Sequence, residues 1–291
     1  MKRKHFSDPA RFQEAVGKHL AEHEAENNLI LGILANILAG DYKDIEPYMS
    51  MIEEDGIIQQ VFLRTPPFPV LISYRKEPPS QGIVGLGVQG LQAAYGDEIK
   101  GMTGDKEIVP HYAEAWSQRT GMEPELNTEM RIYKLEDVNP VEGVPGEMRL
   151  AEAEERDLLL KWFQAFHREA LGEEVEMERV EKGVKHYLHG DPRRRGLMFW
   201  EVEGRPVSMT GYSGPTPHGI RINAVYTPPE LRRNGYASAC VSALSQHLLD
   251  QGYRFCFLFT DLDNPTSNHI YQEIGYRAVS DVDKILFHPQ D

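Results

Sequence analysis

The sequence predicts an α/β protein built from two units. Helical and strand-like patterns alternate along all 291 residues, and a chain of this length favours two domains of conventional size. The continuous apolar run at 255–259 suits a central strand that is buried on both faces. A basic, glycine-containing loop separates a predicted strand at 222–226 from a predicted helix that follows it. We therefore expect sheets flanked by helices, with a ligand-binding loop in the second half.

The segment 137–146 is the predicted linker between the two units. It is rich in Asp, Asn, Pro, Gly and Val and shows no periodicity, which is typical of a connection between domains. We therefore expect an N-terminal domain over residues 1–136 and a C-terminal domain over residues 147–291.

Periodicity, capping residues and turn residues predict the elements of each half. In the first half they are a helix that begins after Asp8, a helix that ends at Gly40, strands at 57–63 and 70–74, a short helix near Leu91, a helix at about 105–119 and a strand at 130–135. In the second half they are a strand at 148–151, helices through 158–166 and up to Leu188, strands at 197–202, 206–212 and 220–226, a helix after Gly235, a strand at 255–259, a short helix between Pro265 and Gly275, and strands near 277–279 and 284–287.

The loop at 230–237 has the features of an anion-binding site. Apolar residues in the helix after it recur at the helical period, so one face is buried and the amino end points back at the loop. The first amide groups of a helix lack intrahelical partners and carry the positive end of its dipole. Gly235 lets the backbone approach an anion, and Arg232 and Arg233 add charge. The sequence predicts that residues 233–238 bind a pyrophosphate, which we favour over a merely solvated basic loop.

The order of motifs in the second half resembles the GCN5-related N-acetyltransferase (GNAT) superfamily. Arg232-x-x-Gly235-x-Ala237 follows the fourth predicted strand, as in the family's loop Gln/Arg-x-x-Gly-x-Gly/Ala, and Asn264 precedes Tyr271 by seven residues. The resemblance covers residues 147–287. The first half looks like a degenerate copy without such a loop, as in tandem members. Each domain is therefore expected to be a mixed, mostly antiparallel sheet flanked by helices, and the C-terminal domain to be complete.

The resemblance implies transfer of an acetyl group from acetyl-coenzyme A to an amine of a small molecule or peptide, by direct attack in a ternary complex. It implies that Tyr271 gives a proton to the leaving thiolate, because a phenol of pKa about 10 suits a thiol of about 8.5. The implied coenzyme A contacts are Val225, Tyr226, Thr227, Arg232, Arg233, Asn234, Gly235, Tyr236, Ala237, Ser238 and Asn264. Two plainer interpretations stand beside these roles: Tyr271 as a core aromatic residue, and Asn264 as an N-cap only.

The general base is not assigned. Many members of the family carry a carboxylate on the fourth strand, whereas this sequence has Asn223, whose amide does not take up a proton. Glu169, Glu201 and Glu203 are possible bases, and the reaction needs none if the amine arrives neutral. The missing carboxylate motivates a second hypothesis, a non-catalytic acyl-coenzyme A-binding sensor or scaffold.

The composition limits the classes of partner that the protein is expected to bind and the compartment in which it is expected to reside. The net charge of −14 argues against a general nucleic-acid binder and is compatible with a cationic substrate. The two cysteines, Cys240 and Cys256, fit small core residues of a reducing compartment. The basic start is not followed by an apolar run, and the longest apolar stretch, 29–39, is too short to span a bilayer. We expect a soluble, cytoplasmic protein without membrane contact, in which oligomers are possible.

Three further motifs have a plainer interpretation. Residues 85–90 spell a dinucleotide fingerprint, but no regular strand–helix–strand unit surrounds them. His19 and His23 stand four apart on a predicted helix, yet the glutamates around them favour a charged, solvated face over a metal site. The basic run 193–195 is expected to be a solvated turn. We therefore predict neither a dinucleotide-binding loop nor a bound metal.

Overall fold

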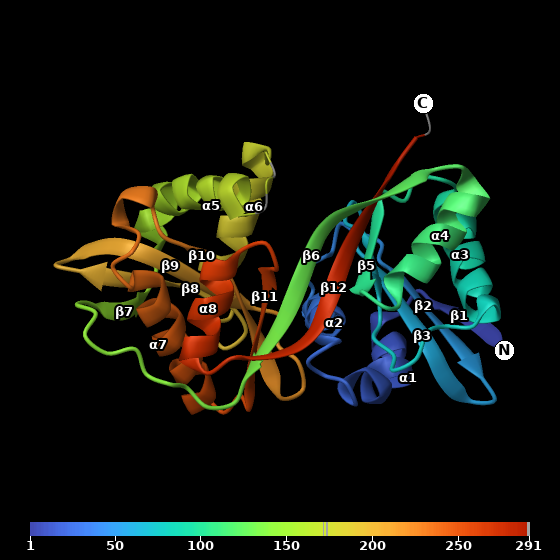
Figure 1. Ribbon diagram of the computed structural model, residues 1–291, viewed down its shortest axis with the longest axis horizontal. Coiled ribbons are helices and arrows are strands. Elements are labelled where there is room, and N and C mark those ends of the chain that lie inside the picture. Colours follow the sequence, from blue (N-terminus) through green and yellow to red (C-terminus); the bar gives the residue numbers. More distant parts are fainter. Residues whose placement is uncertain (171, 173, 290–291) are drawn as a thin grey trace. The chain divides into compact units, whose positions relative to one another are not determined.

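The computed structural model describes residues 1–170, 172 and 174–289 (Figure 1). The chain forms two compact units, each assembled from several segments. The first contains Met1–Ile132, Phe259–Pro265 and residues 278–289, and the second contains Tyr133–Leu258 and Thr266–Arg277. The predicted linker, 137–146, lies within the second unit, and the domain boundaries drawn from the sequence stay a prediction.

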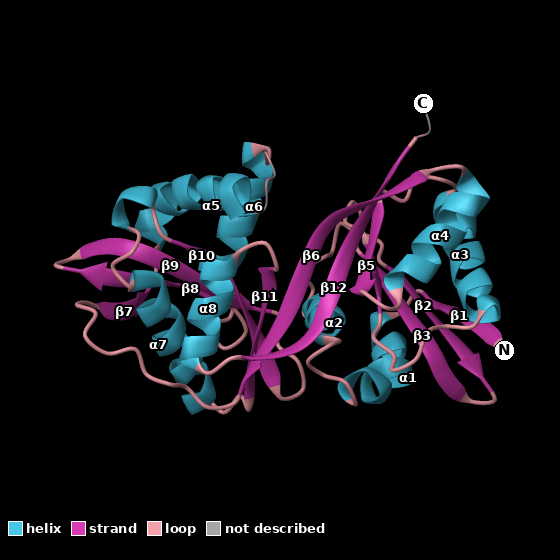
Figure 2. Ribbon diagram, viewed as in Figure 1, coloured by secondary structure: helices cyan, strands magenta, loops and turns pink. Residues whose placement is uncertain are grey.

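The sheet of the first unit has the strand order β1-β2-β3-β4-β5-β12-β6. Its strands are β1 (Lys2–Phe6), β2 (Tyr48–Glu54), β3 (Ile57–Arg64), β4 (Val70–Ile72), β5 (Gly101–Asp105), most of β12 (Arg277–His288) and most of β6 (Glu123–Leu135) (Figure 2). Neighbours from β1 to β4 pair antiparallel, as do β12 and β5, whereas β4 and β5 are parallel. The last strand of the chain thus completes the sheet of the first unit.

Helices cover both faces of this sheet. On one face, α1 (Pro9–Ala21) and α2 (Asn28–Leu38) pack through residues such as Phe12 and Leu34 against β2 and β3. On the other face, α3 (Gln81–Tyr95) and α4 (Val109–Thr120) pack on a cluster that includes Phe62 and, from β12, Phe287. Helix α1 begins as the sequence predicts, because the Asp8 side chain accepts the amide N–H of Ala10 at 2.8 Å.

The second unit repeats this layering. Its strands β7 (Glu147–Leu150), β8 (Gly196–Val202), β9 (Arg205–Ser213) and β10 (Gly219–Tyr226) pair antiparallel in that order, and β10 pairs with β11 (Phe255–Asp261) in parallel. Helices α5 (Arg156–Ala170) and α6 (Met177–Leu188) cover one face, while α7 (Tyr236–Asp250) and α8 (Pro265–Ile274) cover the other. Two short 3₁₀ turns, at Ala153–Glu155 and Pro229–Leu231, precede α5 and α7.

Several elements differ from the sequence-based expectation. Strands β1, β2 and β5 were not predicted; β5 has two glycines in five residues, and β1 is nearly all charged and exposed. The two short strands expected at the end of the chain are one strand, β12. The short helix near Leu91 is the 15-residue α3, which contains the whole glycine-rich segment 85–90. A Cβ on Gly87 would lie 2.7 Å from the Phe62 ring, so this glycine serves close helix–sheet packing.

Candidate active site

Strands β10 and β11 separate before they end. The pairing register runs only from Gly219 with Phe255 to Arg221 with Phe257, although β10 continues to Tyr226 and β11 to Asp261. A parallel pair that separates in this way leaves backbone N–H and C=O groups of the second part of β10 available for a ligand. The separation lies at the carboxyl ends of two parallel strands, where ligands of α/β sheets commonly bind.

A β-bulge distorts β10 where it separates from β11. The register with β9 shifts between Asn223 and Tyr226, and Ala224 adopts a left-handed backbone with φ of +48°. Because one extra residue is inserted, the alternation of side chains is reset. Val225 packs with the cluster under α7, whereas Ala224 and Tyr226 pack with the cluster under α5 and α6. The bulge therefore redirects the main chain of residues 225–227 just before the basic loop.

The amino end of α7 is open. Helix α7 begins at Tyr236, its N-cap is Gly235, and no side chain caps it. The first amide with an intrahelical acceptor is that of Ala239, which donates to Gly235 O at 2.9 Å. In the described part of the chain, we find no acceptor for the N–H groups of residues 233–238. Uncompensated N–H groups at the positive end of a helix dipole are suited to hold a phosphate.

Two features of position 235 require a glycine: its backbone conformation and the close approach of Val144. Its φ of +79° lies in the left-handed region that favours glycine. A Cβ at this position would stand 2.8 Å from Cγ2 of Val144, so a side chain would push the loop at 137–146 away. The predicted close approach of the backbone at this glycine is thus compatible with the structure.

The two loop arginines differ in their contacts. Arg232 Nε donates to the carbonyl oxygen of Thr227 at 2.9 Å, and its Nη2 pairs with Glu169 at the end of α5. Arg233 is exposed, has a left-handed φ of +66°, and forms no ion pair among the described residues. Nδ2 of Asn234 donates to the carbonyl oxygen of Leu231 at 2.9 Å, which holds the turn before the helix. Of these two arginines, only Arg233 has a guanidinium group without an acidic partner among the described residues.

Tyr271 projects from α8 into the core of the second unit. It is 8% exposed, and its ring lies 6.5 Å from that of Tyr133 and 6.0 Å from that of Tyr276. Burial raises the pKa of Tyr271 to about 12, so the phenol keeps its proton at neutral pH and can act as an acid. Burial also raises the pKa of the Cys240 thiol to about 12.

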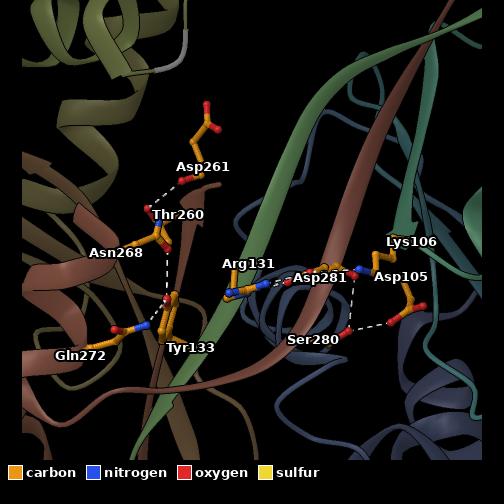
Figure 3. Close-up of polar contacts among 10 residues, drawn as sticks. All are labelled: Asp105, Lys106, Arg131, Tyr133, Thr260, Asp261, Asn268, Gln272, Ser280 and Asp281. Atoms are coloured by element: carbon orange, nitrogen blue, oxygen red, sulfur yellow. Dashed lines mark hydrogen bonds and ion pairs between the residues drawn. The ribbon is translucent and has the colours of Figure 1, made fainter. Parts of the chain in front are cut away.

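Tyr133 lies beside Tyr271, although no sequence pattern singles this residue out. Its hydroxyl donates to Oδ1 of Asn268 at 3.0 Å and accepts from Nε2 of Gln272 at 3.1 Å, so it contacts two turns of α8 (Figure 3). Tyr133 comes from β6, far from α8 in sequence, and is fully buried. A strand was predicted there, but nothing in its pattern signals which helix it supports.

Asn223 is fully engaged in hydrogen bonds. Its Oδ1 accepts from the Tyr187 hydroxyl at 2.6 Å, and its Nδ2 donates to Oγ of Ser213 at 2.9 Å. Both polar atoms of the side chain are thus used, and they connect α6, β9 and β10. Asn223 therefore braces the strand immediately before the bulge.

The three candidate carboxylate bases lie in different places. Glu201 pairs with Arg149 on β7, and Glu203 occupies the β8–β9 turn with φ of +49°. Glu169 pairs with Arg232 and accepts from the Tyr226 hydroxyl at 3.3 Å. Of the three, only Glu169 contacts residues predicted to bind the cofactor. Asn264, a predicted cofactor contact, falls in the segment Phe259–Pro265 of the first unit, and its role stays a prediction.

The comparisons with known proteins place this arrangement in a family. Residues 156–276, from the start of α5 to the end of α8, match the family model "Acetyltransferase (GNAT) family". This part of the chain belongs to the GNAT family. The GNAT domain thus contains the bulged strand, the open helix start and Tyr271. No curated protein matches the chain.

Solved GNAT structures share the fold of the whole chain. A GCN5-related N-acetyltransferase from Kribbella flavida has a TM-score of 0.57 and 14% identity, over 90% of this chain and 96% of that one. A GNAT acetyltransferase from Colwellia psychrerythraea has a TM-score of 0.56 and 10% identity, over 100% of both chains. A tandem GNAT protein from the clavulanic acid biosynthesis pathway has a TM-score of 0.57 and 11% identity, over 100% of both chains. The chain consists of two GNAT-like domains.

Residues 1–170, 172 and 174–289 contain no group of three or more His, Cys, Asp or Glu that could hold a metal ion. Within the same residues, no helix is both long and apolar enough to cross a membrane.

Proposed function

We propose that the C-terminal GNAT domain transfers an acetyl group from acetyl-coenzyme A to an amine of a small molecule or peptide. One observation carries the proposal: the bulged strand β10 leads through Gly235 into a helix whose first amide groups have no partner. Strand, glycine loop and open helix start follow one another directly along the chain in the second unit, an order that suits an extended, phosphate-bearing ligand.

The residues present fit coenzyme A. The N–H groups of residues 233–238 would hold its pyrophosphate, and the exposed Arg233 would add charge. The main chain of Val225, Tyr226 and Thr227 would contact the pantetheine arm, because the bulge turns it away from regular pairing. Arg232 would act indirectly, since it holds the carbonyl of Thr227 in place.

The acetyl thioester of acetyl-coenzyme A supplies the acyl group. Tyr271 would hold a proton for the departing sulfur, and burial keeps that proton in place before the reaction. Asn223 takes no proton from the amine, because its side chain is an amide whose two polar atoms are already engaged. The amine would therefore react as the neutral base and lose its proton to water.

The experiment is a panel assay with radiolabelled acetyl-coenzyme A, small amines and peptides, together with calorimetric binding of coenzyme A. Tyr271→Phe should lower turnover and leave coenzyme A affinity unchanged. Tyr276→Phe is the matched control, because this buried tyrosine lies beside Tyr271, and within the described part of the chain its hydroxyl forms a hydrogen bond only with Oγ of Ser245, 2.8 Å away. No acetylated product with any amine, together with no binding of coenzyme A, would refute the proposal.

The engaged side chain of Asn223 favours one alternative, a non-catalytic acyl-coenzyme A sensor or scaffold. In that case coenzyme A binds, no amine is acetylated, and Tyr271→Phe changes nothing measurable. For either function we place the protein in the cytoplasm, because both cysteines are buried and free, as expected in a reducing compartment.

A further inference from the structure

Hydrogen bonds through Asn223 connect helix α6 to the strands beneath it. The hydroxyl of Tyr187, in the last turn of α6, donates to Oδ1 of Asn223 at 2.6 Å, and Nδ2 of Asn223 donates to Oγ of Ser213 on β9 at 2.9 Å. Burial raises the pKa of Tyr187, so the phenol keeps its proton and is the donor of the first bond. The Asn223 side chain is therefore held by a helix on one side and by the neighbouring strand on the other.

Position 211 on β9 restricts the Asn223 side chain further. A Cβ on Gly211 would lie 2.7 Å from Oδ1 of Asn223 and 3.4 Å from Cβ of Ala224, so the two strands approach closely here. Asn223 and Gly211 also form the last regular pair of β10 and β9 before the register shifts. The side chain that α6 holds thus belongs to the residue at which regular pairing ends.

The bulge at Ala224 needs support from residues on both sides of it. Its left-handed φ of +48° is unfavourable for a residue with a Cβ. Such strain persists in a folded protein only where the surrounding structure holds the chain in place. After the bulge, Oγ of Ser208 donates to the carbonyl oxygen of Tyr226 at 3.2 Å and lies 2.9 Å from Oγ1 of Thr227. Before the bulge, the chain is held through Asn223.

Loss of the support before the bulge would let Ala224 relax toward a regular strand. Relaxation changes the direction of the main chain after the bulge, because the extra residue is what resets the pairing with β9. The amino end of α7 is held separately, since Ala239 and Cys240 of this helix are buried in the core of the second unit. The contact between α6 and Asn223 should therefore control residues 225–227 and leave the amide groups of α7 in place.

We propose that Tyr187 is a positioning residue for coenzyme A, a role that rests on the proposed function. Through Asn223, the Tyr187 hydroxyl keeps the main chain of residues 225–227 in the orientation that receives the pantetheine arm. The phosphates of the cofactor are bound elsewhere, at the amino end of α7. Loss of this hydroxyl should therefore weaken the binding of the pantetheine arm and spare the binding of the nucleotide.

The test is calorimetric titration of the full-length protein with coenzyme A and with 3′-phospho-ADP, which has the same nucleotide and phosphates but no pantetheine arm. The wild type should bind coenzyme A more tightly than 3′-phospho-ADP. Tyr187→Phe should bind coenzyme A about three- to ten-fold more weakly, the effect expected from one lost hydrogen bond. Its affinity for 3′-phospho-ADP should change by less than about two-fold, because the amide groups of α7 are unaffected.

Tyr212→Phe is the matched control. The Tyr212 hydroxyl also donates at 2.6 Å, to the carbonyl oxygen of Pro192, and this bond does not involve the bulge. Urea unfolding should show a similar loss of stability in both variants, whereas only Tyr187→Phe should lose coenzyme A affinity. Asn223→Ala should show the same selective loss as Tyr187→Phe. The double variant should bind coenzyme A like Asn223→Ala alone, because both substitutions break the same connection.

Equal binding of coenzyme A by the wild type and Tyr187→Phe overturns the role of Tyr187 and leaves the acetyl-transfer proposal standing. Parallel weakening of both ligands in Tyr187→Phe, or the same loss in Tyr212→Phe, also overturns it, because the hydrogen bond then only stabilises the fold. If Tyr187→Phe does not fold, Asn223→Ala decides by the same comparison of ligands. Equal affinity of the wild type for both ligands overturns the role of residues 225–227, and binding of neither ligand overturns the proposed function as well.

Discussion

The guanidinium group of Arg232 holds the carbonyl oxygen of Thr227 at 2.9 Å. The same side chain pairs with Glu169, so its charge is largely compensated before any ligand arrives. The next residue, Arg233, has no acidic partner in the described structure. The adjacent arginines of the loop therefore have separate roles, one supporting the main chain and the other exposed to a ligand.

We expect Arg233→Gln to weaken coenzyme A binding about three- to ten-fold at low salt, because it removes an uncompensated charge near the phosphates. Arg232→Gln should change the affinity less than about two-fold, because exposed ion pairs contribute little. Calorimetry at two salt concentrations checks both, and only the Arg233 effect should shrink at high salt. A larger loss in Arg232→Gln would place that guanidinium group on the phosphates.

Gly235→Ala should both destabilise the protein and impair coenzyme A binding. The left-handed backbone costs about 1–2 kcal/mol for a residue with a Cβ, and the Cβ would displace Val144. Gly252→Ala is the matched control, since its φ is +101° and a Cβ there meets nothing within 4 Å. Urea unfolding should show a loss in both variants, whereas coenzyme A titration should show a loss only in Gly235→Ala. Equal coenzyme A affinity in the two variants would contradict the assigned loop.

Tyr271→Phe should reduce kcat by about 100-fold, the lower range for loss of a general acid. Because the pKa of Tyr271 is about 12, the wild-type rate should not decline through loss of this proton below about pH 11. A pH–rate profile of both proteins checks this. A decline near pH 9 that disappears in Tyr271→Phe would show that the phenol titrates far below the expected value.

Tyr133→Phe should affect catalysis indirectly. It removes the hydroxyl that bonds to Asn268 and Gln272, and it leaves the ring packed beside Tyr271. We expect a several-fold decrease in kcat with little change in coenzyme A affinity, and a loss of about 1 kcal/mol in stability. Crystallography of the variant should show a displaced α8. Unchanged kcat with the same loss of stability would mean that these bonds only stabilise the fold.

Stability should decrease at alkaline pH. Burial raises the pKa of Cys240 and Cys256 from 9.0 to about 12, and that of Tyr271 from 10.0 to about 12. Above pH 9 the unfolded chain therefore binds fewer protons than the folded chain, so the free energy of unfolding falls as pH rises toward 12. Urea unfolding should show a flat region below about pH 8 and a decrease above about pH 9. Cys240→Ala should reduce that slope by up to about 1.4 kcal/mol per pH unit; an unchanged slope would mean that this thiol ionises freely in the folded state.

The sequence was most informative where one local pattern has one structural meaning. Asp8 before Pro9 predicts a helix start, and α1 begins there. Gly235 before an apolar helical face predicts the uncapped amino end of a helix, and α7 begins there. It was least informative at β5, because Gly101 and Gly104 have low strand propensity. This strand is stabilised by pairing with its neighbours β4 and β12. The sequence predicts that Arg232 contacts coenzyme A, but it does not reveal that this arginine pairs with Glu169. That partner lies 63 residues away in the sequence, beyond the reach of a local pattern.

The sequence by itself determined the GNAT-like order of strand, loop and helix, because turn residues, helix caps and hydrophobic period act over a few neighbouring residues. Only the tertiary structure decided which distant residues meet. It brought Tyr133 of β6 beside Tyr271 and placed the end of the chain in the sheet of the first unit. These contacts depend on the pairing of strands far apart in sequence, which hydrophobic pattern alone does not specify.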